Sequence, residues 1–219
     1  MTKNAAPNAR RSRLAPALSP EFYERDTEQV ARDLLGAILE CRTSDGVAAG
    51  RIVETEAYIG EHDLACHAAA GRTARTAPLY GAPGIAYVYF IYGMYWCFNA
   101  VTRAENEPSA VLVRAIEPIV GVELMKRRRP KARRAVDLTN GPGKLCLALG
   151  IDGQHNRLSL QRPPIVIRSG DAVPDRDVIV TPRIGISESA DWPLRWVIAD
   201  NPYASKTPAH FPRTYLANT

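Results

Sequence analysis

The sequence predicts an α+β fold: a single domain around a mainly antiparallel, curved sheet, with one prominent β-hairpin and flanking helices. Short β-rich runs follow one another with little more than turns between them, which is typical of antiparallel strands. Helical patterns are few and lie outside these runs, and no segment repeats. The 219 residues suit one domain, since single domains commonly reach about 200 to 250 residues.

The N-terminal end differs in composition from the rest of the chain. Residues 1–20 scatter basic side chains among Ala and Pro and hold too few apolar residues to build a core, so we predict a flexible basic tail there. Residues 21–219 then form the single domain. At its start, Asp26 or Thr27 caps a short helix that Gly36 ends.

Five runs rich in β-branched and aromatic residues are predicted to be strands. A Ser-Asp-Gly turn joins the first run to the second, and Tyr92-Gly93-Met94 joins the third to the fourth as a hairpin. The five predicted strands cover residues 37–41, 47–54, 85–91, 95–103 and 110–115.

A long connection, punctuated by Gly, Ala and Pro, covers residues 61–84. Loops of this length inside compact domains are usually functional, so we expect it to wall a pocket. Helices are predicted at 120–125 and at 144–149, the second opened by Pro142 and closed by Gly150. The C-terminal segment is expected to pack back on the sheet, after brief strands at 165–167 and 178–180.

Positive charge is concentrated in one part of the sequence. The net charge is +5, and seven of the nine residues from Lys126 to Arg134 are basic. Such a cluster favours a polyanionic partner, although a charged run can also be a solvated loop, and Pro130 rules out a continuous helix through it.

The cysteines are scattered and form no CxxC pair, so the sequence predicts neither a disulfide framework nor a zinc site, and we expect no metal and no cofactor. The chain has no apolar run of about 18 residues and begins with a polar, basic stretch, which indicates neither a membrane span nor a secretory signal. The four cysteines are Cys41, Cys66, Cys97 and Cys146.

Two carboxylates stand out in a segment that should be buried. Glu54 and Glu56 lie two residues apart in an extended run, so their side chains share one face. A buried carboxylate beside flat rings suits a site that grips a planar ring and performs acid or base chemistry on it. Spacing alone does not choose between the two glutamates, and both could instead lie on a solvated face or pair with Arg51 and Arg114.

Six segments occur in the order and spacing of the alkyladenine (3-methyladenine) DNA glycosylases, which the chain resembles over nearly its whole length after the tail. They are ETEAY at 54–58, His67, YVYFIYG at 87–93, Asn99, VLVRAIEP at 111–118 and GPGKL at 141–145.

The resemblance implies a monofunctional glycosylase that flips an alkylated purine out of double-stranded DNA and hydrolyses its N-glycosidic bond. The implied substrate is 3-methyladenine, with 7-methylguanine and the deaminated purine hypoxanthine as further candidates. Glu56 then corresponds to the general base that activates water, and Arg114 to the arginine that helps to hold this water. One flipped nucleotide needs one pocket, so we expect a monomer.

Base binding is assigned by the same resemblance to Tyr58, His67 and Tyr89, whose rings would stack on the base and favour cationic purines. Asn99 would obstruct the 2-amino group of guanine, unless its amide only ties down nearby backbone. Tyr92, at the tip of the DNA-facing hairpin, would fill the space left by the flipped nucleotide, unless it folds back on its neighbours. Taken singly, each of these tyrosines is more often a core residue.

Five basic residues are expected to contact DNA phosphates without reading sequence. This role places the enzyme at the nucleoid of a bacterial cytoplasm or in a eukaryotic nucleus. The five residues are Lys126, Arg127, Arg128, Arg129 and Lys144.

Two other functions are compatible with the same residues. A bifunctional glycosylase/lyase would use a lysine, such as Lys144, as a nucleophile at C1′, and a non-catalytic module would use the aromatic side chains only to bind nucleic acid. Residues 72–80 depart from the family pattern at Thr76, Leu79 and Tyr80, so the sequence predicts the reaction more firmly than the substrate range.

Overall fold

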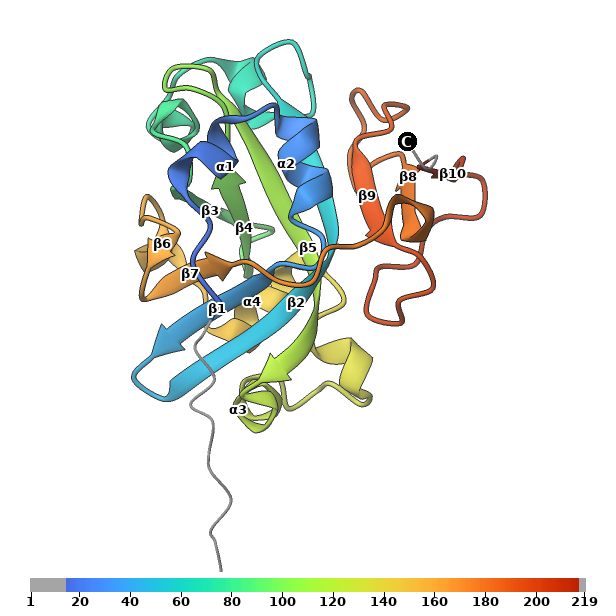
Figure 1. Cartoon of the computed structure of the whole chain (residues 1–219). Helices are drawn as coiled ribbons and strands as arrows, with labels where there is room; N and C mark the ends of the chain where they lie inside the picture. The colour runs from blue at the N-terminus through green and yellow to red at the C-terminus, as the bar shows by residue number, and fades with distance from the viewer. Residues whose placement is uncertain (1–14, 217–219) are drawn as a thin grey trace, which may run out of the picture.

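A computed structural model describes residues 15–216 (Figure 1). Its ten strands form one sheet in which all paired strands are antiparallel. A few short helices flank this sheet. The predicted α+β class is therefore confirmed.

The centre of the sheet is the long strand β2 (Gly46–Ile59). Along one edge it pairs first with β1 (Ile38–Thr43) and then with β9 (Arg195–Ile198); along the other it pairs with β5 (Ser109–Val120). The strands predicted at 47–54 and 110–115 are too short, because β2 continues to Ile59 and β5 to Val120. Pairing with β5 runs to the end of β2, and Thr55 and Glu56 are fully buried in it.

The predicted hairpin forms from β3 (Ala86–Ile91) and β4 (Tyr95–Val101), and β4 continues the sheet from β5. At its tip, Tyr92 and Gly93 both have positive φ, at 53° and 66°. The sheet is completed by four short strands: β6 (Gln161–Arg162), β7 (Ile165–Arg168), β8 (Val178–Thr181) and β10 (Thr214–Tyr215).

The helices cover the sheet from opposite sides. Thr55 of β2 donates a hydrogen bond from Oγ1 to the Ala31 carbonyl of α2 (Thr27–Asp33) at 2.8 Å. Glu54 and Glu56 alternate with Thr55 along the strand, so their side chains face away from α2. Asp26 caps α2 by accepting from the Glu28 amide, as predicted. The helices are α1 (Pro20–Glu24), α2 (Thr27–Asp33), α3 (Val122–Arg128) and α4 (Pro142–Leu149).

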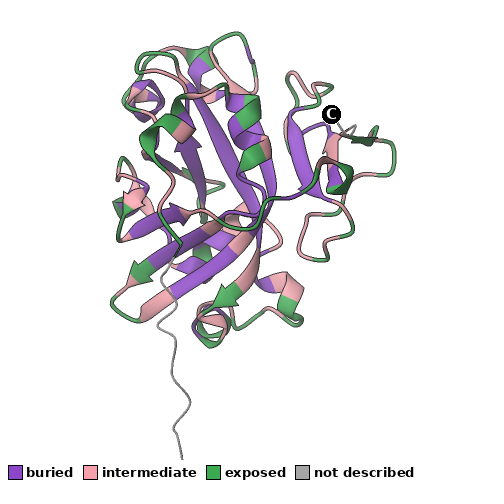
Figure 2. Cartoon of the chain, in the orientation of Figure 1, coloured by how far each residue is buried: buried purple, intermediate pink, exposed green. Residues whose placement is uncertain are grey.

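Several 3-10 turns connect these elements, and two of them lie in the long predicted loop. A small apolar cluster beneath that loop, which includes Leu79 and Tyr87, supplements the main core. Figure 2 shows that β2 and β5 are buried along most of their length. The turns are η1 (His67–Ala70), η2 (Ala77–Tyr80), η3 (Ala135–Leu138), η4 (Gly153–His155) and η5 (Asp175–Asp177).

The predicted N-terminal tail lies partly outside the structure, which does not describe residues 1–14. Within the rest of that tail, Ala17 bridges to Arg168 of β7, and the Leu18 amide donates to the Ile167 carbonyl at 2.9 Å. Contacts with the sheet thus begin before residue 21. Among residues 15–216, no helix is long and apolar enough to cross a membrane.

Candidate active site

A cavity of about 460 Å³ opens on the face of the sheet that carries Glu54 and Glu56. Its walls come from β2, the β3–β4 hairpin, β5, the start of α4 and the segment 184–186, and the long loop after β2 contributes Ala65 and His67, as predicted for that loop. Six of the residues predicted for the site line it: Tyr58, His67, Tyr89, Tyr92, Arg114 and Lys144.

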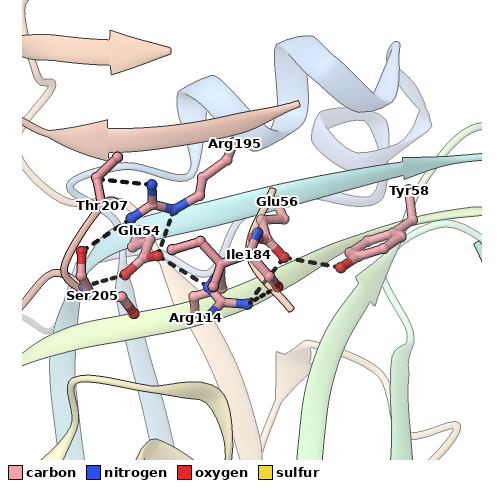
Figure 3. Close-up of polar contacts among 8 residues, drawn as sticks. All are labelled: Glu54, Glu56, Tyr58, Arg114, Ile184, Arg195, Ser205 and Thr207. Carbon is pink, nitrogen blue, oxygen red and sulfur yellow. Dashed lines mark hydrogen bonds and ion pairs between the residues drawn. The ribbon is translucent and has the colours of Figure 1, made fainter. Parts of the chain in front are cut away.

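Glu56 is fully buried and does not itself line this cavity, but it contacts three residues that do, as Figure 3 shows. Its Oε2 accepts hydrogen bonds from the Tyr58 hydroxyl at 2.9 Å and from Arg114 Nη1 at 3.2 Å. Its Oε1 accepts one from the Ile184 amide at 2.8 Å. The alternative that Glu56 lies on a solvated face is therefore wrong. Of the two arginines considered as ion-pair partners, Arg114 contacts both Glu56 and Glu54.

Arg114 joins the two carboxylates. Its Nε donates to Glu54 Oε1 at 3.0 Å, while Nη1 reaches Glu56 and the Ile184 carbonyl. Burial opposes the charge on Arg114, but the two carboxylates outweigh burial and raise its pKa. Burial likewise opposes ionisation of Glu54, yet Arg114 and Arg195 lower its pKa. The site thus holds a buried, ionised network.

The aromatic side chains form a compact group. The His67 and Tyr89 rings meet edge to face with centroids 4.5 Å apart, and His67 Nδ1 is 2.8 Å from the Tyr87 hydroxyl. Burial raises the pKa of Tyr58 well above its usual value, and neighbouring Glu56 adds to this. Tyr58 is therefore a neutral hydrogen-bond donor. Burial, reinforced by Arg75, lowers the pKa of His67 and keeps its imidazole neutral.

Asn99 does not line the main cavity. It lies in an adjoining cavity of about 20 Å³ that Tyr58, His67 and Tyr89 also line, and its Nδ2 donates to the Tyr87 carbonyl at 3.0 Å. Such a space holds about one water molecule and no purine. In the unbound protein this amide ties down backbone across the hairpin, and a base reaches it only if the surrounding rings move apart.

Tyr92 projects from the hairpin tip with 77% of its surface exposed, so it does not fold back on Tyr95 or Trp96. Met94 beside it is also exposed. This large apolar tip at the rim of the cavity has little structural use and suits contact with another molecule.

The predicted phosphate ligands do not form one group. Arg128 points inward, where its guanidinium donates to the Ala148 carbonyl at 3.2 Å and to Thr43 Oγ1 at 2.6 Å. Arg129 donates to the Asp137 carbonyl. Lys126 and Arg127 are exposed at the end of α3, and Lys126 pairs with Glu123 at 2.7 Å. Lys144 alone of the five lines the cavity, with Nζ 2.7 Å from Asn140 Oδ1.

Sequence reasoning missed three contributors to the network: Arg195, the Ile184 amide and the Ser205 amide. Arg195 is fully buried and donates from Nε to Glu54 Oε1 at 2.7 Å. Its position inside the apolar run LRWVI was a usable signal, because an arginine in a buried strand needs a carboxylate partner. Backbone amides carry no such signal. Within residues 15–216, no three His, Cys, Asp or Glu side chains are grouped to hold a metal ion.

Comparisons with known proteins identify the family of this chain. A family model described as Methylpurine-DNA glycosylase (MPG) matches residues 21–202. A protein of Myxococcus xanthus (strain DK1622) is 48% identical over 194 residues, covering 87% of this chain and 94% of its own length. One of Methanocella arvoryzae (strain DSM 22066 / NBRC 105507 / MRE50) is 47% identical over 195 residues, covering 87% and 96%. Both carry the name "Putative 3-methyladenine DNA glycosylase".

The family match includes every residue that lines the cavity as well as Glu54, Glu56, Arg114 and Arg195 of the buried network, and the relatives are similar over almost their whole length. The chain therefore belongs to the methylpurine-DNA glycosylase family and is a DNA glycosylase, a hydrolase of N-glycosyl bonds.

Proposed function

We propose that this enzyme removes alkylated purines, with 3-methyladenine as the principal substrate, from double-stranded DNA and acts as a monofunctional, monomeric glycosylase. The observation that carries the proposal is a buried carboxylate, Glu56, paired with Arg114 beside a cavity lined by tyrosines. The names of the curated relatives support the choice of lesion.

The reaction needs a water molecule and a proton acceptor. As the bond between the base and C1′ breaks, its electrons pass to the base, and a cationic 3-methyladenine leaves as a neutral molecule. Glu56 takes the proton of the water that attacks C1′. Its Oε1 accepts only the Ile184 amide, which leaves a lone pair for this water. Because Glu56 is fully buried, Tyr58 or the 184–186 segment must shift to admit water.

The cavity suits a flat, positively charged base. Tyr58 and Tyr89 line the cavity, and an aromatic ring contributes about 1 to 3 kcal/mol per stacked base and attracts cations. The guanidinium carbons of Arg183 and Arg75 lie 4.7 Å and 5.5 Å from the centroids of these two rings, so a base would stack on the faces that these groups leave open. His67 is neutral, so it does not repel a cationic base. At the rim, Tyr92 is placed to fill the gap left by a flipped nucleotide, which offsets part of the flipping cost of a few kcal/mol.

Lys144 favours a second candidate, the glycosylase/lyase, because its side chain lines the same cavity. A single-turnover assay in EDTA, on a methylated duplex, separates the two by scoring free base and strand nicks before and after alkali. Monofunctional action gives base release with nicks only after alkali. Nicks before alkali, with borohydride trapping lost in Lys144→Ala, would establish the lyase.

The assignment of Glu56 is tested with Glu56→Gln, which keeps the shape of the side chain but removes the carboxylate that accepts the proton. We expect base release to fall by at least about 100-fold, since general base catalysis contributes about 10² to 10⁴-fold. Binding to a duplex with an abasic-site analogue should persist. Release at the wild-type rate would remove Glu56 from the mechanism, and binding without any release by the wild type would establish a binding module.

A further inference from the structure

We propose that Glu54 and Arg195 are positioning residues for the glycosylase reaction: together they hold the Arg114 guanidinium in the orientation that directs one of its nitrogens at Glu56. The inference rests on the proposed role of Glu56 as the general base. Glu54 and Arg195 form a buried ion pair, and neither residue lines the cavity.

The geometry around Glu54 leaves little freedom (Figure 3). Its Oε1 accepts from Arg114 Nε at 3.0 Å and from Arg195 Nε at 2.7 Å, and its Oε2 accepts from the Ser205 amide at 2.6 Å. The guanidinium of Arg114 is planar, so fixing Nε against Glu54 also fixes the direction of Nη1, which faces Glu56 at 3.2 Å. Glu54 thereby sets the angle at which Arg114 meets Glu56.

Arg195 in turn is anchored from outside the sheet. Its Nη1 donates to Thr207 Oγ1 at 3.0 Å and its Nη2 to the Ser205 carbonyl at 3.1 Å. The segment that follows β9 therefore closes over the ion pair and supplies an amide to Glu54 and two acceptors to Arg195. Arg195 is the partner of Glu56 in the pairing of β9 with β2, so the backbones of the two residues lie side by side. The contacts that anchor Arg195 therefore hold a residue next to the reaction site.

The charges of the network balance. Two carboxylates, Glu54 and Glu56, face two guanidinium groups, Arg114 and Arg195. In a buried site, removal of one charge leaves an opposite charge without its partner, and that charge then interacts strongly with Glu56. The other ionisable groups around Glu56 do not supply a compensating charge: Tyr58, Tyr89 and Cys97 have raised pKa values and are neutral, and Arg183 is paired with Asp63.

The proposal predicts opposite effects of two variants on the acid limb of the rate profile. Glu54→Gln leaves an excess positive charge and should move the acid limb to lower pH, whereas Arg195→Met leaves an excess negative charge and should move it to higher pH. Both should slow base release by roughly 10- to 100-fold through misalignment. Arg195→Lys restores the charge and should return the limb to its wild-type position.

The measurement is single-turnover release of 3-methyladenine from a methylated duplex across the whole acid limb, in buffers spaced by about half a pH unit. The positive charge of this lesion is fixed over the range, so the limb reports the protein. Glu40→Gln is the matched control, because Glu40 forms a buried pair with Arg168 at 2.9 Å between β1 and β7, away from the cavity. This control should lose stability and keep the wild-type limb.

Shifts in the same direction, or no shift in either variant, would overturn the positioning role, while loss of release in Glu56→Gln would still uphold the proposed function.

Thr207→Val provides a milder test if the charge variants do not fold. It keeps every charge and removes one acceptor of Arg195, so release should slow several-fold with an unchanged limb. Release at the wild-type rate would count against the proposal.

Discussion

The buried ionisable side chains around the cavity have different charge states because their neighbours differ. Arg114 and Arg195 keep Glu54 ionised against the effect of burial, whereas the burial of Tyr58 beside Glu56 keeps its hydroxyl protonated. Tyr58 can therefore donate to Glu56 while its ring remains available for a base. At the residue scale, burial and neighbouring charges therefore decide which side chains accept hydrogen bonds and which donate them.

His67 provides a prediction about pH. Burial, with Arg75 nearby, lowers its folded-state pKa below the unfolded value of about 6.5, so the unfolded chain binds more protons between these two values. The contribution of the neutral His67 to the free energy of unfolding is therefore complete above about pH 6.5 and is lost as the pH falls through the folded pKa. Imidazole titration by NMR should give a value below about 6.5 for His67. A value at or above this reference would contradict the assignment.

At the scale of elements, the site depends on how closely α4 approaches the hairpin. Gly143, in the first turn of α4, lies against Tyr95 at the start of β4. A Cβ at Gly143 would come within 2.9 Å of Tyr95 Cβ and Cγ, which are not the flexible end of that side chain. The glycine therefore allows the contact between α4 and the hairpin that closes one wall of the cavity.

We expect Gly143→Ala to destabilise the protein by about 1 to 3 kcal/mol through overpacking, although alanine is the better helix former. It should also weaken binding to lesion-containing duplex, since the hairpin must shift. Urea unfolding and fluorescence anisotropy measure the two effects. Gly141→Ala is the control, because its Cβ would lie 3.6 Å from Lys144 Cδ, an ordinary contact. Equal stability of the two variants would show that the close approach is unimportant.

The hairpin tip should act in binding and not in stability. Tyr92→Ala removes an exposed ring, so the melting temperature should stay the same while binding to a lesion duplex weakens by about 1 to 3 kcal/mol relative to undamaged duplex. Tyr215→Ala, at another exposed tyrosine on β10, serves as the control and should change neither quantity. Equal losses with Lys126→Ala on both duplexes would limit Tyr92 to a general contact.

At the scale of the whole molecule, the C-terminal third of the chain closes the site that the first half builds. Asp63, in the long loop after β2, forms a fully buried ion pair with Arg183, with Nη2 and Oδ1 2.8 Å apart. The guanidinium carbon of Arg183 also lies 4.7 Å from the ring centroid of Tyr58. One ion pair thus ties the loop, the C-terminal segment and an aromatic wall of the cavity together.

Breaking this pair should have a large effect on folding. Asp63→Asn leaves the Arg183 charge buried without a carboxylate, and we expect the free energy of unfolding to fall by about 3 to 5 kcal/mol in urea titrations. Asp45→Asn is the matched control. Its carboxylate is 67% exposed and 3.6 Å from Arg128, and exposed pairs contribute about 0 to 1 kcal/mol. A similar loss in both variants would mean that Asp63 does not join the segments.

Local patterns in the sequence predicted most elements correctly. The Asp26 cap, Pro142 and Gly150 bound their helices as expected, and the hairpin turns at Tyr92-Gly93-Met94, whereas α2 ends at Asp33, before the predicted end at Gly36. These features are local because each depends on the backbone preferences of a few neighbouring residues. The lengths of β2 and β5 were underestimated, because pairing with strands that are distant in sequence extends both beyond the runs that local patterns predict.

The sequence by itself determined the reaction class, since the carboxylate and aromatic motifs are short and their order along the chain is enough to identify the family. Only the tertiary structure decided which charges meet. Arg195 and Ser205 reach Glu54 from about 150 positions further along the chain, and Arg128, one of a run of similar arginines, turns inward to α4. A buried charge takes whichever partner the packing of distant segments brings within hydrogen-bonding distance, and no local pattern records that choice.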